Sequence, residues 1–176
     1  MIAGADGPWV VEGVRAICGD GVAAAARLQR IEGPAHVADD SATWILHGVR
    51  SNERYVERAE KTRLGAVQEG LDRPHSLCAA LIPIRKSDAW WDLPQDERRA
   101  LFETRSRHIA IGADYLPAIA RRLYHCRDLG GPFDFLTWFE FKEADTPAFE
   151  DLLARLRATE EWRYVDREVE LRLRRR

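Results

Sequence analysis

The sequence predicts one α+β subunit of ferredoxin-like topology, and the order of strand and helix patterns in residues 77–173 carries this prediction. Residues 133–141 alternate with mainly phenylalanine on one face, and residues 165–173 alternate between aliphatic and charged side chains. A period of two residues is typical of strands with one buried face. Helical patterns lie between the strands, so the order strand, helices, strand, helix, strand predicts an antiparallel sheet with helices on one face.

Two further strands are predicted from shorter patterns. Residues 41–50 form an apolar run that closes at Gly48, and residues 77–85 form a second apolar run. Pro83 lies inside the second run. Since proline cannot donate a ladder hydrogen bond, we expect either an edge strand or a bulge at this position.

Helices are expected over residues 95–107, 109–124 and 148–157. The second helical pattern is interrupted by Pro117, and the third follows Thr146 as its capping residue. The length of 176 residues suits one compact domain or two small ones that share a core. We therefore expect a C-terminal ferredoxin-like module over residues 76–176 and a shortened counterpart with fewer helices over residues 1–75.

Composition excludes two large classes of partner. Lys and Arg number 27 against 29 Asp and Glu, and neither half of the chain is strongly basic, so we expect no nucleic-acid partner. No stretch approaches the roughly 20 apolar residues of a membrane helix, so we expect no membrane contact. The three cysteines, Cys18, Cys78 and Cys126, form no C-x-x-C pair, and the first residues do not match a signal peptide. These features predict reduced thiols in a cytoplasmic protein.

Among the histidines, one is spaced in a way that suits a flat ligand. The sequence contains no nucleotide-binding glycine pattern, no nucleophile elbow and no H-E-x-x-H zinc pattern. A haem iron, in contrast, needs only one protein ligand. His108 is followed four residues later by Gly112, which leaves the same helical face open. Because a lone helical histidine is more often a partly exposed polar residue, the spacing by itself leaves both interpretations open.

Four segments of the chain are informative together: AALIPIRKSDAWW, RHIAIGADYLPAIARRLYHCRDLG, PFDFLTWFEF and AFEDLLARLRATEEWRYVDREVELRL. In residue types, spacing and order they resemble the chlorite dismutase family, and specifically its short, dimeric lineage. The resemblance extends from Trp44 to Leu173, about three quarters of the chain. It implies a fold of the dimeric α/β barrel type, a homodimer, and one haem b per subunit. Its implied activity is the decomposition of chlorite to chloride and dioxygen. Since the chain has no C-x-x-C-H motif, such a haem would be held non-covalently.

The resemblance also implies roles for individual residues. His108 matches the proximal iron ligand, and Glu161 matches the acid that accepts the other ring proton of that ligand. Arg121 matches the distal arginine that marks true chlorite dismutases. The remaining matches are aromatic residues of the haem pocket or interface and a lysine near a haem propionate: Trp90, Trp91, Trp138 and Lys61.

These roles require a break in the second helical pattern. His108 and Arg121 are 13 residues apart, and a straight helix would separate their Cα atoms by about 20 Å. Two residues on one unbroken helix cannot face the same haem from opposite sides. We therefore expect a break between Gly112 and Pro117.

Other functions remain open from the sequence. A coproheme decarboxylase-like enzyme would share the fold, but the resembling enzymes of that branch carry no arginine at the place matched by Arg121. A non-catalytic haem-binding protein would share His108 without needing Arg121. A weak peroxidase with organic substrates is a third possibility on the same fold.

Overall fold

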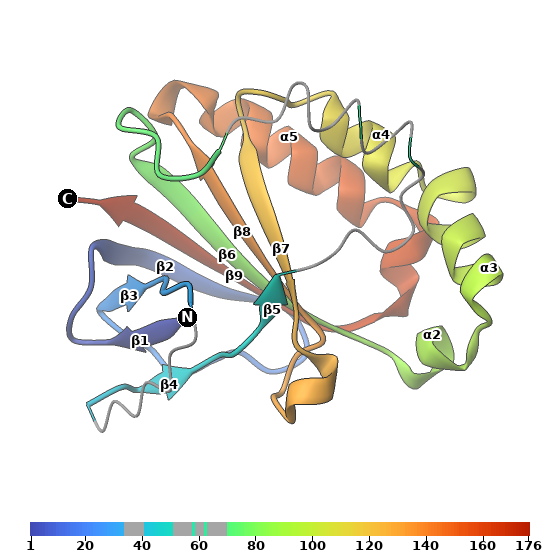
Figure 1. The fold of residues 1–176 in the computed structure, drawn as a ribbon, viewed down its shortest axis with the longest axis horizontal. Helices are drawn as coiled ribbons and strands as arrows, with labels where there is room; N and C mark the ends of the chain where they lie inside the picture. The colour runs from blue at the N-terminus through green and yellow to red at the C-terminus, as the bar shows by residue number, and fades with distance from the viewer. Residues whose placement is uncertain (34–40, 51–57, 59–61, 63–69) are drawn as a thin grey trace.

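The fold is α+β, with one curled antiparallel sheet and helices against part of it (Figure 1). A computed structural model describes residues 1–33, 41–50, 58, 62 and 70–176. The described strands are β1 (Ile2–Gly4), β2 (Trp9–Cys18), β3 (Arg27–Gln29), β4 (Trp44–Ile45), β5 (Val49–Arg50), β6 (Cys78–Lys86), β7 (Ala120–His125), β8 (Phe135–Phe141) and β9 (Val165–Arg175). The described α-helices are α2 (Asp88–Asp92), α3 (Gln95–Arg99), α4 (His108–Ala113) and α5 (Thr146–Arg157), and a π-helix spans Ala100–Arg105. Within the described part of the chain, no helix is long and apolar enough to cross a membrane.

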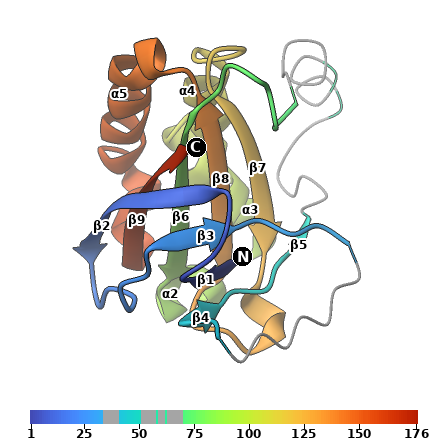
Figure 2. The ribbon, with the colours of Figure 1, turned by 90° about the vertical axis from the view of Figure 1, so that its left-hand side faces the viewer.

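All the described strands join a single sheet in the order β4-β1-β3-β2-β9-β6-β8-β7-β5. The central strands β9, β6 and β8 lie side by side, with α5 and α4 against one of their faces (Figure 1). The short strands β1, β3 and β4 curl around toward the opposite face (Figure 2). Strands β9, β6 and β8, which the patterns in residues 77–173 predict, therefore form the middle of the sheet, and the N-terminal strands extend it.

Each face of the central strands has its own apolar core, whereas the alternation in the sequence predicts only one buried face. Phe139 and Phe141 of β8 pack with Phe149 and Leu152 of α5. On the other face, Trp138 packs against Trp9, with ring centroids 5.4 Å apart. Residue period and burial agree along this strand, so its register is fixed by the need to fill both cores.

Most of the strong patterns are confirmed. The alternating stretches at 133–141 and 165–173 correspond to β8 and β9, and the apolar run at 77–85 corresponds to β6. The helix expected at 148–157 is α5, which begins two residues earlier, at Thr146. The helix expected at 95–107 begins as α3 and continues as the π-helix.

The interpretation of Pro83 as a sign of an edge strand is wrong. β6 is central, between β9 and β8, and Pro83 lies opposite Leu136 of β8. On the β9 side, the pairing runs to Leu81 and resumes at Ile84, so it passes over the proline that has no N–H group. The irregularity in this strand comes later, between Arg85 and Lys86.

Two other expectations are corrected at the level of secondary structure. The strand expected over residues 41–50 is divided into β4 and β5, which lie at opposite edges of the sheet. The helix expected over residues 109–124 ends at Ala113, and its second half is strand β7. Pro117 lies between the two elements and cannot continue a helix, and β7 gains its hydrogen bonds from β8.

A buried ion cluster lies between β9 and α5. Glu168 and Glu170 are both 0% exposed, although their side of the strand reads as polar in the sequence. Arg157 of α5 donates to Glu168 Oε1 from Nε at 2.9 Å and to Glu170 Oε2 from Nη2 at 2.6 Å. Glu170 also pairs with Arg15 and Arg172. The arginines compensate the buried charges, as burial of carboxylates requires.

The cluster predicts a specific loss of stability in acid. Burial raises the pKa of Glu170, but hydrogen bonds from Arg15, Arg157 and Arg172 outweigh it and lower the pKa from 4.5 to about 2. This stabilisation is therefore present above about pH 5 and is lost as the pH falls toward 2. Glu170→Gln should lower the free energy of unfolding near pH 7 by about 3–5 kcal/mol, and its difference from the parent should shrink at pH 3. Urea unfolding at both pH values measures this, and a difference independent of pH would contradict it.

Candidate functional site

His108 is the first residue of α4, and its imidazole is held from one side by a buried carboxylate. The Nδ1 atom lies 2.7 Å from Oε2 of Glu161. Since a carboxylate can only accept, the proton of a neutral imidazole lies on Nδ1, and Nε2 is the nitrogen that can bind a metal. The ring of Phe102 stacks on the imidazole, with centroids 4.3 Å apart and planes 21° apart. The His108 side chain is 21% exposed, so it is partly open while its orientation is constrained.

Glu161 is fixed from several directions just before β9. It is 3% exposed and lies in the short 3₁₀ segment Glu160–Tyr164. Its Oε1 accepts a hydrogen bond from Nζ of Lys86 at 2.7 Å, and its backbone N–H donates to Oγ of Ser106 at 2.9 Å. Burial raises the pKa of Glu161, but its interactions with His108 and Lys86 outweigh burial and bring the pKa to about 2. The acceptor behind His108 is therefore a carboxylate anion.

The Lys86–Glu161 pair makes a testable contribution to stability. Both side chains are 4% exposed, so removing one charge leaves the other buried and uncompensated. Lys86→Met should lower the free energy of unfolding by about 3–5 kcal/mol, and the double variant Lys86→Met/Glu161→Gln should recover part of that loss. Urea unfolding of the three proteins measures both effects. A double variant no more stable than Lys86→Met would contradict the pairing.

Arg121 extends from β7 toward the same helix. It lies opposite Phe139 of β8, on the sheet face that carries the α5 core. Its guanidinium group lies against Gly112, and a Cβ atom at position 112 would be 2.8 Å from Cζ of Arg121. Only glycine allows this approach, one helical turn after His108. The chain leaves the helix at Ala113 and returns as β7 from Ala120, so the expected break lies where the roles of the two residues require it.

The adjacent tryptophans of α2 contact different parts of the site. Trp90 is 1% exposed, and Nζ of Lys86 lies 4.7 Å from its ring centroid. Trp91 stacks on Phe135 of β8, with centroids 6.0 Å apart, and Cζ of Arg127 lies 3.8 Å from its ring centroid. Trp90 thus contacts the lysine of the ion pair behind His108, and Trp91 contacts β8, the strand beside β7.

Comparison with known proteins decides the family. A sequence profile described as chlorite dismutase matches residues 23–176. The chain belongs to the chlorite dismutase family. Chlorite dismutase from Ideonella dechloratans is 30% identical over 150 residues, which are 82% of this chain and 50% of that protein. The chain thus spans about half the length of this curated relative.

Solved chlorite dismutases share the fold. The dimeric enzyme from Nitrobacter winogradskyi is 54% identical, with a TM-score of 0.91, and the match covers 98% of this chain and 97% of that one. A mutant enzyme from Candidatus Nitrospira defluvii is 29% identical, with a TM-score of 0.63 and coverage of 77% and 56%. The same organism's enzyme in complex with imidazole is 29% identical, with a TM-score of 0.61 and coverage of 76% and 55%.

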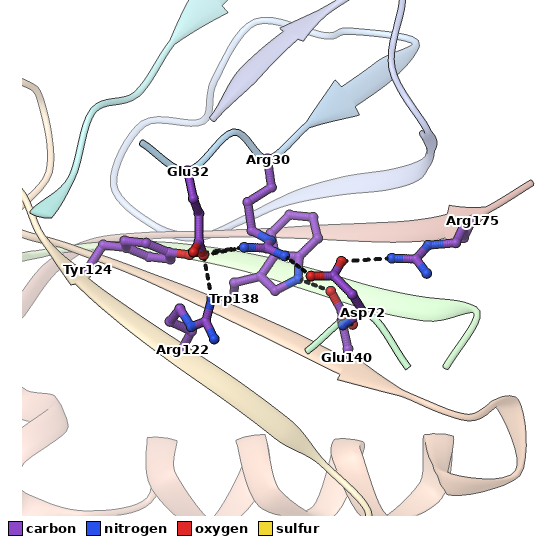
Figure 3. A network of polar contacts seen from close by, with 8 residues as sticks. All are labelled: Arg30, Glu32, Asp72, Arg122, Tyr124, Trp138, Glu140 and Arg175. Carbon is purple, nitrogen blue, oxygen red and sulfur yellow. Dashed lines mark hydrogen bonds and ion pairs between the residues drawn. The ribbon is translucent and has the colours of Figure 1, made fainter. Parts of the chain in front are cut away.

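Trp138 does not join the other residues that the chlorite dismutase resemblance singles out. It lies opposite Arg122 in β7, whereas Arg121 lies opposite Phe139, so Trp138 occupies the other face of the sheet. There its Nε1 donates to Glu140 Oε1 at 2.8 Å, within the polar network of Figure 3. We therefore leave Trp138 out of the residues proposed to hold a cofactor. Lys61, matched to a propionate-side lysine, lies outside the described residues.

The sequence reasoning missed Lys86, although a signal for it was present. In β6, Cys78, Ala80, Ile82 and Ile84 belong to the core beneath α5, and Lys86 continues the same alternation. A lysine in phase with buried apolar residues needs a buried partner, and Glu161 is that partner. In this member of the chlorite dismutase family, the carboxylate behind His108 is therefore held by a residue from a separate strand.

Proposed function

We propose that this chain binds one non-covalent haem b through His108 and decomposes chlorite to chloride and dioxygen. The observation that carries the proposal is the placement of two chemically different groups at α4. His108 has a carboxylate on Nδ1, and the guanidinium of Arg121 lies against Gly112, one turn away. A candidate metal ligand on α4 and a permanent cation from β7 thus lie at the same helix.

The residues fit a haem. A histidine whose second ring nitrogen is bound by a carboxylate is a typical axial ligand, because the acceptor fixes the tautomer and makes the ring more basic. Phe102 and Trp90 add apolar surface around this side of the site. Relatives support an open binding position, since the enzyme of Candidatus Nitrospira defluvii has been solved with imidazole and, as a mutant, with cyanide.

In the proposed reaction, the haem, the groups behind His108 and Arg121 have separate roles. When bound, haem supplies the redox-active iron at which the Cl–O bond is cleaved and the O–O bond is formed. Glu161 and Lys86 keep His108 oriented and electron-rich, which favours ferric iron. Arg121 is charged at every accessible pH, so it attracts the chlorite anion and retains the hypochlorite anion close by until dioxygen is made. One chlorite ion gives one chloride ion and one dioxygen molecule, so no external reductant is consumed.

The experiment that tests this function measures dioxygen directly. The protein is loaded with haemin, chlorite is added, and dissolved oxygen is followed with an electrode. We expect one dioxygen per chlorite consumed. Haem binding without dioxygen release would contradict the activity and would favour a non-catalytic haem protein.

We also propose that the chain forms a homodimer and that its ferredoxin-like modules are residues 1–75 and 76–176. The Nitrobacter winogradskyi protein, which matches over nearly the whole chain, is described as dimeric. The mass of one chain is 20.1 kDa, so light scattering should give about twice that value. A haem-loaded, active monomer would contradict the dimer, and a pentamer would contradict the short lineage.

A further inference from the structure

Trp162 lies beside the proposed iron ligand and touches both partners of Glu161. Its ring is nearly parallel to that of His108, with centroids 6.4 Å apart and planes 17° apart. Nζ of Lys86 lies 5.4 Å from the same indole centroid. The Nε1 atom of Trp162 donates a hydrogen bond to Oε2 of Glu168 at 2.8 Å. One indole therefore connects the groups around Glu161 to a second buried carboxylate.

Glu168 is a firm anchor for that indole. It is 0% exposed, and Arg157 of α5 donates to its Oε1 from Nε at 2.9 Å and from Nη2 at 2.5 Å. A hydrogen bond to a charged acceptor in a dry interior is stronger than one between neutral groups. Trp162 cannot rotate without breaking this bond and leaving a buried carboxylate oxygen without its donor.

We propose that Trp162, anchored by Glu168, is a positioning residue for His108. The anchored indole holds the imidazole ring and the Lys86 ammonium group at the orientation in which both reach Glu161. The proposal deepens the proposed function, because it takes His108 as the axial ligand. Groups behind a metal ligand set its orientation and basicity, and their loss weakens the metal site without removing the ligand.

The buried ion cluster between β9 and α5 could instead have a purely structural role. A variant of Glu170 distinguishes that role from the positioning role. Glu170 shares Arg157 with Glu168 and is equally buried, but its partners are Arg157, Arg15 and Arg172. If the cluster only attaches α5 to β9, then Glu168→Gln and Glu170→Gln should act alike. If Glu168 acts through Trp162, only Glu168→Gln should change His108.

The first test uses the haem-free protein. The Nδ1–H proton of His108 should give a downfield NMR resonance, because its bond to Glu161 deshields it and protects it from exchange with water. Trp162→Phe, which keeps a ring but removes the N–H donor, and Glu168→Gln should both broaden this resonance or shift it upfield. The controls are Glu170→Gln and Trp44→Phe; the latter removes an indole bond to the backbone oxygen of Ala23, 2.9 Å long, in another part of the fold. Both controls should keep the parent resonance.

The second test uses the haem-loaded protein and does not depend on turnover. In the ferrous form, Trp162→Phe and Glu168→Gln should lower the iron–histidine stretching frequency in resonance Raman spectra, in the direction of a Glu161→Ala reference. They should also release haem to apomyoglobin about 10-fold faster than the parent, within the range typical of residues that orient a metal ligand.

The outcomes separate the two claims. If both variants match the parent, or if all four variants change alike, the positioning role is wrong. If His108→Ala keeps the haem spectrum of the parent, the proposed function is wrong. The haem-free resonance then still reports whether Trp162 orients His108.

Discussion

His108→Ala should lose haem affinity by more than about 100-fold, beyond the 10–100-fold typical of residues that only orient a metal ligand. The variant removes the one nitrogen that the Glu161 contact leaves for iron, while Glu161 keeps Lys86 as its partner. The fold should persist, because His108 is 21% exposed and contributes little to either core. Haemin titration followed by the Soret band measures the affinity, and far-UV circular dichroism checks the fold.

The matched control is His75→Ala. His75 is exposed and precedes β6. The His75→Ala variant should bind haem with the affinity of the parent. A His108→Ala protein with an unchanged Soret band and high-spin ferric spectrum would end the assignment of the proximal ligand, and a loss in His75→Ala would show that the titration reports something other than axial ligation.

The central sheet could be predicted from the sequence because its strands show a regular period of two residues. β8 and β9 each alternate over most of their length, and a period of two residues indicates a strand with at least one packed face. Residues 109–124 were harder, because the apolar positions before and after Pro117 fit a helical spacing. The strand in that stretch exists because β8 offers a partner, and this tertiary contact leaves no mark in a local pattern.

Part of the candidate site could also be predicted, but from the family resemblance and not from residue periodicity. The resemblance to the chlorite dismutase family selected His108, Glu161 and Arg121, and the structure brings these residues to α4 and its surroundings. The same resemblance selected Trp138, but sheet register turns it to the opposite face. The role proposed for Trp162 could not be predicted from the sequence, because it depends on a ring contact and a buried acceptor that only the folded chain brings together.

Arg121→Ala should still bind haem but should release less dioxygen per chlorite. The guanidinium is a fixed, planar donor with a permanent charge, so its loss weakens capture of chlorite and lets hypochlorite escape before the O–O bond forms. Loss of one such preorganised donor typically costs about 10²–10³ in rate. The escaped hypochlorite should be trapped by an added scavenger, and it should bleach the haem sooner. Arg121→Lys should fall between the two, since it keeps the charge but loses the fork geometry.

The neighbouring arginine is the internal control, because the pleat of β7 turns it to the other face of the sheet. Arg122 pairs with Glu32, which also accepts from Tyr124 and Arg30, so Arg122→Ala removes one surface contact of a shared acceptor (Figure 3). It should match the parent in oxygen yield and haem lifetime. If Arg122→Ala lost yield while Arg121→Ala did not, the distal role would belong to the other face of β7. If neither variant lost yield, retention of hypochlorite would not depend on an arginine, and the reaction would rely on haem and the proximal residues alone.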